Sequence, residues 1–270
     1  MIKQCIKIND FSKEELLQII DYAEKIKQSP DEYMASLRGK GLGVIFEKPS
    51  TRTRVSFEVG IKQLGGFSYY LAPNEIQLGT REELRDVART LSRYLDAVVL
   101  RTFKHETIDG FSKHATIPII NGLSDFSHPC QAFADYLTIK EKFFDLSAIT
   151  VAYIGDGNNV LHSLVIILSK LGVSMTIATP ETHALNKSVL DKGITYAQES
   201  GATIKVCSSP QEAVKDALSG VASTCLSASC TATHPCDLLI TADATPASPA
   251  VGLRPYTNPT QPSEPSFVFA

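Results

Sequence analysis

Residues 46–54 read Phe46-Glu47-Lys48-Pro49-Ser50-Thr51-Arg52-Thr53-Arg54 and decide how this chain folds. The apolar run Leu42–Phe46 before them predicts a buried strand, and apolar residues at helical spacing after them predict a helix over Thr53–Leu64. Ser50 then lies near the N-cap of that helix, where backbone N–H groups, hydroxyls and guanidinium groups can converge on one anion. The stretch therefore predicts a site for an anion of the size of phosphate. The alternative interpretation is a capped helix whose arginines are solvated.

Strand and helix signals alternate along the rest of the chain. The first block predicts helices over 12–28, 81–94 and 130–144 and strands over 68–71, 97–100 and 117–120. The second predicts strands over 149–154, 173–178 and 202–207 and helices over 160–171 and 188–200. Such alternation is typical of an α/β fold in which helices cover both faces of a parallel sheet. We therefore predict two doubly wound parallel-sheet domains, at 1–144 and 145–217, the second an incomplete Rossmann-like domain.

Polar residues follow two of the predicted strands, with Arg101 after the strand over 97–100 and Asn121 after the strand over 117–120. Arg101 comes directly after the strand over 97–100, and ligands of doubly wound sheets collect at the carboxyl ends of the strands. Its guanidinium can therefore share an anion with the Ser50 loop, although a single Arg at a strand end is more often a surface residue.

Three motifs resemble the carbamoyltransferase (transcarbamylase) family. Residues 46–54 resemble its carbamoyl-phosphate loop, and His128-Pro129-Cys130-Gln131 resembles its second signature. Residues 155–163, Gly155-Asp156-Gly157-Asn158-Asn159-Val160-Leu161-His162-Ser163, resemble the ornithine branch. The resemblance extends from about Leu37 to Ala217. It implies transfer of the carbamoyl group from carbamoyl phosphate to the side-chain amine of ornithine, giving citrulline and phosphate.

The resemblance also implies a role for individual residues. The catalytic residues are expected to be Arg52, Thr53, Arg101 and His128. Carbamoyl phosphate is expected to contact Ser50, Thr51, Arg52, Thr53, Arg101, His128 and Gln131, together with Gln77 from a neighbouring subunit. Asn159 is expected to bind ornithine. The family implies a homotrimer with shared active sites, and no metal or organic cofactor.

Two alternatives remain open, one for the substrate and one for the class of enzyme. The neutral pair Asn158-Asn159 favours ornithine over aspartate, but a relative that uses putrescine fits the same residues. A dinucleotide-binding oxidoreductase is the weaker alternative, because the turn that begins at Gly155 lacks the third glycine of that fingerprint and no acidic residue ends the following strand.

Composition and charge argue against several other classes of protein. The 270 residues have a formal net charge of -3 and a pI near 6.1, and basic residues are interspersed with acidic ones, so no surface for nucleic acid or an anionic membrane is expected. No apolar run is long enough to span a membrane and no leader is evident, which predicts a cytoplasmic protein. The six scattered cysteines are expected to be reduced, and Cys225, Cys230, His234 and Cys236 lack the spacing of a zinc site.

The family pattern stops near residue 217. Residues 218–270 contain no lysine, four charged side chains and seven of the fourteen prolines. The Asp, Ser-Met-Gly and His-Cys-Leu-Pro elements expected from the resemblance are absent there. We interpret the segment as an atypical, poorly structured tail, with a shifted reading frame as the simplest origin. The tail leaves two functions open: a carbamoyltransferase of the ornithine branch with its activity either retained or lost, or a non-catalytic protein that binds carbamoyl phosphate or assembles with intact subunits.

Overall fold

The computed structural model describes residues 4–76, 78, 82–215, 221–224 and 237–242. The chain divides into two compact units. Unit 1 contains residues 1–138 and 158–167, and unit 2 contains residues 139–157 and 168–269. Among the described residues, no helix is long and apolar enough to cross a membrane.

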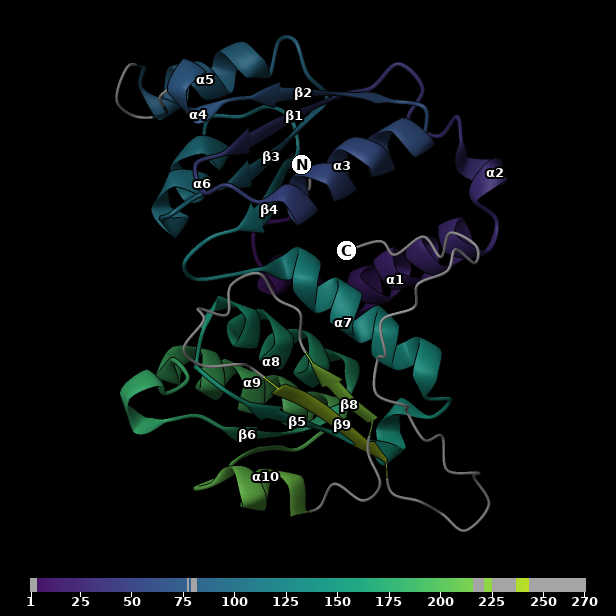
Figure 1. Ribbon diagram of the computed structural model, residues 1–270, viewed down its shortest axis with the longest axis vertical. Coiled ribbons are helices and arrows are strands. Elements are labelled where there is room, and N and C mark those ends of the chain that lie inside the picture. The colour runs from purple at the N-terminus through teal and green to yellow at the C-terminus, as the bar shows by residue number, and fades with distance from the viewer. Residues whose placement is uncertain (1–3, 77, 79–81, 216–220, 225–236, 243–270) are drawn as a thin grey trace, which may run out of the picture. The chain divides into compact units, whose positions relative to one another are not determined.

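Unit 1 is built on a four-stranded parallel sheet with the order β2-β1-β3-β4 (Figure 1). The strands are β1 (Gly41–Phe46), β2 (Phe67–Leu71), β3 (Ala97–Arg101) and β4 (Ile119–Leu123). The helices are α1 (Lys13–Gln28), α2 (Pro30–Tyr33), α3 (Thr51–Gln63), α4 (Pro73–Ile76), α5 (Leu84–Leu91), α6 (His105–Ser112) and α7 (Pro129–Lys142), whose last turn belongs to unit 2. The parallel strands and the intervening helices confirm the predicted α/β class.

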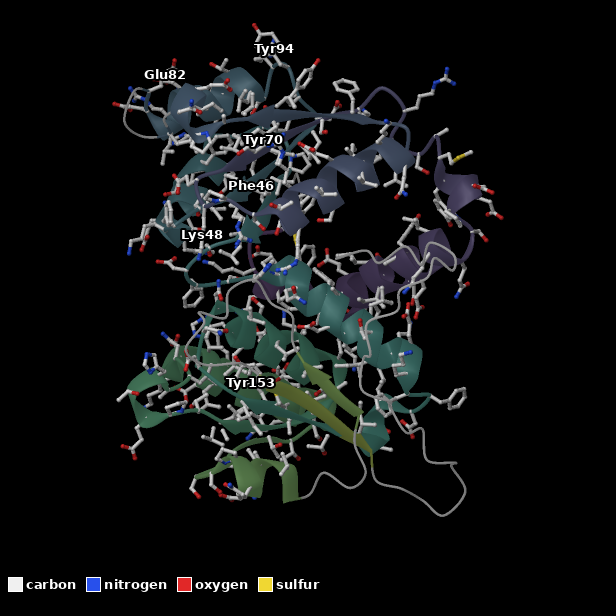
Figure 2. The ribbon with its side chains drawn as sticks, viewed as in Figure 1. Phe46, Lys48, Tyr70, Glu82, Tyr94 and Tyr153 are labelled. Carbon is white, nitrogen blue, oxygen red and sulfur yellow. The ribbon has the colours of Figure 1, made fainter. Side chains whose placement is uncertain are left out.

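Side chains of β1 alternate between two apolar layers. Leu42, Val44 and Phe46 pack with Ile61 of α3 on one face of the sheet. Ile45 points to the other face, where it packs with residues of α5 and α6. Phe46 also contacts Tyr70 edge to face, with ring centroids 6.4 Å apart (Figure 2). Because a strand buried on both faces must be apolar throughout, the continuous run over 41–46 is explained.

Several predicted boundaries differ from the structure, among them those of α3, α5 and β4. Helix α3 begins at Thr51, two residues before the predicted start, because Ser50 accepts a hydrogen bond from the Thr53 N–H and caps the helix there. Helix α5 covers only Leu84–Leu91 of the predicted 81–94. Strand β4 continues through Asn121, whose buried amide donates to two backbone carbonyls, so a polar residue is tolerated inside the strand.

Unit 2 contains a five-stranded sheet with the order β7-β6-β5-β9-β8. Its strands β5 (Ile149–Ile154), β6 (Ser174–Ala178) and β7 (Ile204–Val206) are parallel, as predicted. The helices are α8 (Asn159–Leu171), which begins in unit 1, α9 (Lys187–Ser200) and α10 (Pro210–Lys215). Short 3-10 turns lie at Leu146–Ala148 and Glu181–His183 in unit 2, and at Ile8–Asp10 in unit 1.

The segment predicted to be a poorly structured tail contributes two strands to this sheet. They are β8 (Val221–Thr224) and β9 (Asp237–Ala242). Strand β9 pairs antiparallel with β5 along all six residues of β5, on the side opposite β6. The remaining residues of the segment lie outside the described part of the chain, as do Cys225, Cys230, His234 and Cys236.

Candidate active site

The candidate site lies at the point of the parallel unit 1 sheet where successive strands are added on opposite sides of β1. Strand β2 flanks β1 on one side and β3 flanks it on the other, so the connections that leave β1 and β3 diverge at their carboxyl ends. Phe46 pairs with Arg101 in the register of these two strands. The Glu47 N–H donates to the Arg101 carbonyl over 2.8 Å, and the Glu47 carboxylate accepts from the Phe103 N–H over 2.9 Å. The two loops are thereby fixed together at the position where doubly wound sheets bind ligands.

The first turn of α3 supplies hydroxyl and backbone donors. Ser50 is the N-cap, and its Oγ lies 3.0 Å from Thr53 Oγ1. Thr51 and Arg52 are exposed in the first turn, where the free N–H groups and the helix dipole favour an anion. The other arginine of the stretch, Arg54, is engaged elsewhere. Its Nε lies 2.9 Å from Glu58 Oε1, and its guanidinium carbon lies 3.5 Å from the centroid of the Tyr70 ring.

Arg101 is brought to this turn from the end of β3. Its Nη1 donates to Thr53 Oγ1 over 3.3 Å, and the side chain is only 2% exposed. Its Nε is buried and has no hydrogen-bond partner within the described parts of the chain. Burial lowers the pKa of the Arg101 guanidinium, yet an arginine keeps its charge at neutral pH. A buried cation with an unused donor is suited to an anionic or carbonyl oxygen.

His128 follows β4 and is also buried. The pKa of its imidazole is lowered to about 3, first by burial and then by the positive charge of Arg101. The ring is therefore neutral at neutral pH and has one N–H donor. Its Nδ1 is buried without a hydrogen-bond partner among the residues that the structure describes. These features fit a donor that polarises a carbonyl oxygen without adding a second charge.

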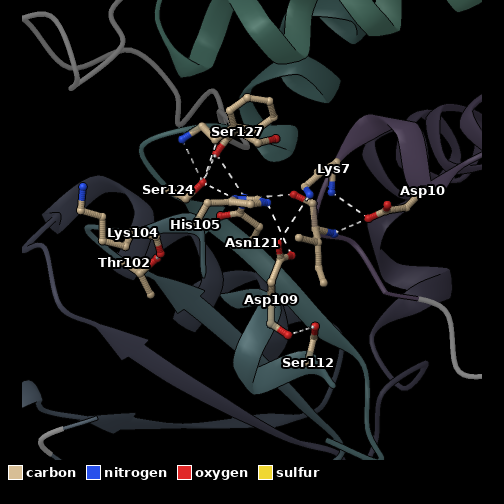
Figure 3. Close-up of polar contacts among 12 residues, drawn as sticks. Lys7, Asp10, Thr102, Lys104, His105, Asp109, Ser112, Asn121, Ser124 and Ser127 are labelled. Carbon is tan, nitrogen blue, oxygen red and sulfur yellow. Dashed lines mark hydrogen bonds and ion pairs between the residues drawn. The ribbon is translucent and has the colours of Figure 1, made fainter. Parts of the chain in front are cut away.

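The turn before His128 is held by a network centred on His105 and Ser124 (Figure 3). Ser124 Oγ lies 2.7 Å from His105 Nδ1 and accepts from the Ser127 N–H over 3.1 Å. On the other side of the ring, His105 Nε2 is 3.6 Å from Asp109 Oδ1. Burial and the nearby Lys7 charge lower the pKa of His105, so its ring acts as a neutral hydrogen-bonding group. The network fixes the turn that positions His128.

The first turns of α8 also form hydrogen bonds with this turn. Asn159 Nδ2 donates to the Ser124 carbonyl, and His162 Nδ1 lies 2.8 Å from the Phe126 carbonyl. Ser163 Oγ accepts from the His128 N–H over 2.9 Å. Residues 159, 162 and 163 lie on one face of a helix. The sequence did not predict roles for His162 and Ser163, because their partners are distant along the chain.

Gln131 and Gln77 are the remaining residues predicted to contact carbamoyl phosphate. Gln131 lies in the first turn of α7, and its Nε2 donates to Asp135 Oδ1 over 2.9 Å. Gln77 lies outside the described residues. Within the described residues, no cluster of three or more His, Cys, Asp or Glu side chains is placed to hold a metal ion. Unit 1 thus brings together Ser50, Thr53, Arg101 and His128.

Comparison with protein-family models gives two matches. Residues 3–141 match the aspartate/ornithine carbamoyltransferase carbamoyl-P binding domain. Residues 147–227 match the Asp/Orn binding domain of the same family.

Individual relatives agree with these matches. An ornithine carbamoyltransferase of Listeria innocua is 46% identical over 215 residues, which cover 80% of this chain and 68% of the relative. One from Thermococcus kodakarensis is 48% identical over 212 residues, covering 78% and 67% respectively. The solved structure of ornithine carbamoyltransferase from Pyrococcus furiosus superposes with a TM-score of 0.77 at 44% identity, covering 78% of this chain and 68% of that one. The chain therefore belongs to the aspartate/ornithine carbamoyltransferase family.

Proposed function

We propose that this chain transfers the carbamoyl group of carbamoyl phosphate to the side-chain amine of ornithine, giving citrulline and phosphate. The observation that supports this most is the meeting of a capped helix N-terminus with a buried arginine, where Arg101 Nη1 lies 3.3 Å from Thr53 Oγ1. The names of the relatives support ornithine as the acceptor.

In the proposed reaction the phosphate is held by Ser50, Thr51, Arg52 and Thr53. Arg101 and His128 donate hydrogen bonds to the carbonyl oxygen, which gains negative charge as the amine attacks the carbonyl carbon. The tetrahedral intermediate then collapses: the bond between the carbonyl carbon and the phosphate oxygen breaks, and the amine nitrogen loses one proton to the departing phosphate. Gln131 accepts a hydrogen bond from the carbamoyl NH2.

Asn159 is proposed to contact ornithine. Because its Nδ2 donates to the Ser124 carbonyl, its Oδ1 is the atom suited to accept from an ammonium group. We also propose carbamoyl-phosphate and ornithine domains at 1–144 and 145–217, a cytoplasmic location, and a homotrimer in which Gln77 reaches the site of a neighbouring subunit.

The composition after residue 217 favours a second candidate function, a protein that binds carbamoyl phosphate or assembles with intact subunits without catalysis. Citrulline formation distinguishes the two candidates when this chain is compared with a chimera that carries a regular family C-terminus after Ala217. Loss of ornithine positioning is expected to lower turnover at least about a thousandfold, or about 4 kcal/mol in barrier. Comparable turnover would show that residues 218–270 build a working ornithine site, and no citrulline from either protein would reject the proposed reaction.

A further inference from the structure

Helix α7 carries a carboxylate that none of the proposed catalytic steps uses. Gln131 and Asp135 are four residues apart and lie on the same face of the helix. Gln131 Nε2 donates to Asp135 Oδ1 over 2.9 Å. Asp135 as a whole is half-buried, but its Oδ2 is buried and has no hydrogen-bond partner within the described ranges. A buried carboxylate with one unpaired oxygen disfavours folding, so stability alone does not explain its presence.

The chemistry of the pair fixes the direction of the Gln131 carboxamide. An ionised carboxylate only accepts hydrogen bonds, whereas a carboxamide has one donating and one accepting end. Gln131 must therefore turn its NH2 group toward Asp135, and its Oε1 faces away from that residue. Burial raises the pKa of Asp135 to about 6, and the hydrogen bond from Gln131 opposes the rise. Asp135 is consequently ionised at neutral pH.

We propose that Asp135 is a positioning residue that makes the site specific for a carbamoyl group, because it holds the Gln131 carboxamide with its oxygen toward the ligand. This inference rests on the proposed function, in which Gln131 contacts the NH2 of carbamoyl phosphate. An acceptor at that point bonds to an NH2 group and cannot bond to the methyl group of acetyl phosphate. With an apolar or carboxamide side chain at position 135, Gln131 can rotate and present either end, and the preference falls.

A matched pair of stable ligands measures this preference on the full chain. Phosphonoacetamide carries an NH2 group where 2-oxopropylphosphonate carries a methyl group, and the two share the phosphonate and the carbonyl. Calorimetry is expected to show that the unaltered chain binds phosphonoacetamide about tenfold more tightly than 2-oxopropylphosphonate. A factor of about ten is what one additional hydrogen bond contributes in a desolvated site. In Asp135→Leu and Asp135→Asn the ratio is expected to fall to within about twofold of unity, while the affinity for 2-oxopropylphosphonate stays the same.

An exchange of the two side chains tests positioning rather than folding. In the double variant Gln131→Glu with Asp135→Asn, the amide of position 135 donates to one carboxylate oxygen of position 131, and the other oxygen faces the ligand. The exchange moves the negative charge from position 135 to position 131 without changing the net charge, and it affects both phosphonates equally, so the ratio of affinities is expected to return to about tenfold.

Each outcome decides a separate point. A ratio that stays the same in Asp135→Leu and Asp135→Asn overturns the inference and leaves the proposed function intact. Equal losses for both ligands also overturn it, because they indicate a structural role. If Asp135→Leu does not fold, Asp135→Asn, which keeps the size of the side chain, decides the result. If neither ligand binds the unaltered chain, both the inference and the proposed function are rejected.

Discussion

The backbone N–H of His128 donates a hydrogen bond to Ser163 Oγ over 2.9 Å, across 35 residues of sequence. The same hydroxyl lies 3.1 Å from Ser127 Oγ, and all three residues are buried. Ser163 therefore holds the peptide that leads into the imidazole of His128, and a change at Ser163 is expected to affect a site that it does not itself enter.

Ser163→Ala removes the acceptor of a buried N–H and is expected to lower the free energy of unfolding by about 1–3 kcal/mol. Urea unfolding measures this cost, and calorimetry with phosphonoacetamide measures the accompanying loss of affinity. Ser92→Ala is the control, because the Ser92 hydroxyl also accepts from a backbone N–H, that of Thr116 over 3.0 Å, but lies at the end of α5 outside the network around His105. If both variants reduce phosphonoacetamide affinity equally, Ser163 does not position His128.

The pKa of His128 predicts a pH dependence of stability. Its value is about 3 in the folded chain and about 6.5 when unfolded, so the unfolded state binds more protons between these values. The contribution of neutral His128 is fully present above pH 6.5 and is lost as the pH falls toward 3. From pH 7.5 to 5.5, the free energy of unfolding should fall by about 1 kcal/mol more for the unaltered chain than for His128→Gln. Parallel pH profiles from urea unfolding would contradict the burial of a neutral imidazole.

Gly157 lies too close to a neighbouring backbone for a side chain. A Cβ there would lie 2.5 Å from the Ala184 carbonyl atoms, and the Gly157 N–H donates to the His183 carbonyl over 2.7 Å. Gly157→Ala is therefore expected to lower the free energy of unfolding by about 2 kcal/mol, as overpacking does. Gly60→Ala is the matched control: no atom lies within 4 Å of its Cβ, and alanine inside α3 is expected to stabilise by up to about 1 kcal/mol. Equal effects in thermal unfolding would show that the loop accommodates the methyl group.

The proposed oligomer predicts the sedimentation behaviour of the full chain. Gln77 is expected to act across a subunit boundary, so unit 1 should make the contacts that hold the subunits together. Analytical ultracentrifugation is expected to show a species of three chains. A monomer at every accessible concentration would reject the shared active site.

Local patterns in the sequence predicted the parts of the site that depend on local structure. Ser50 was predictable because a helix cap and the apolar run before it are encoded within a few residues, and Arg101 because it ends a buried strand. The length of β4 was not predictable, because Asn121 depends on the carbonyls of Ile6 and Ser127. The role of Ser163 and the pairing of β9 with β5 depend on contacts between distant segments, for which a single sequence gives no periodic signal.

The central claim is that the first turn of α3 and Arg101 form a site for carbamoyl phosphate, and calorimetric titration of Arg52→Ala tests it most directly. Loss of a charge-assisted contact of about 1.5–3 kcal/mol is expected to weaken binding by at least about tenfold, and loss of a two-bond contact abolishes measurable binding. Arg85→Ala is the control, because Arg85 pairs with Glu83 on an exposed surface, and it should bind carbamoyl phosphate like the unaltered chain. Unchanged affinity in Arg52→Ala would contradict the claim.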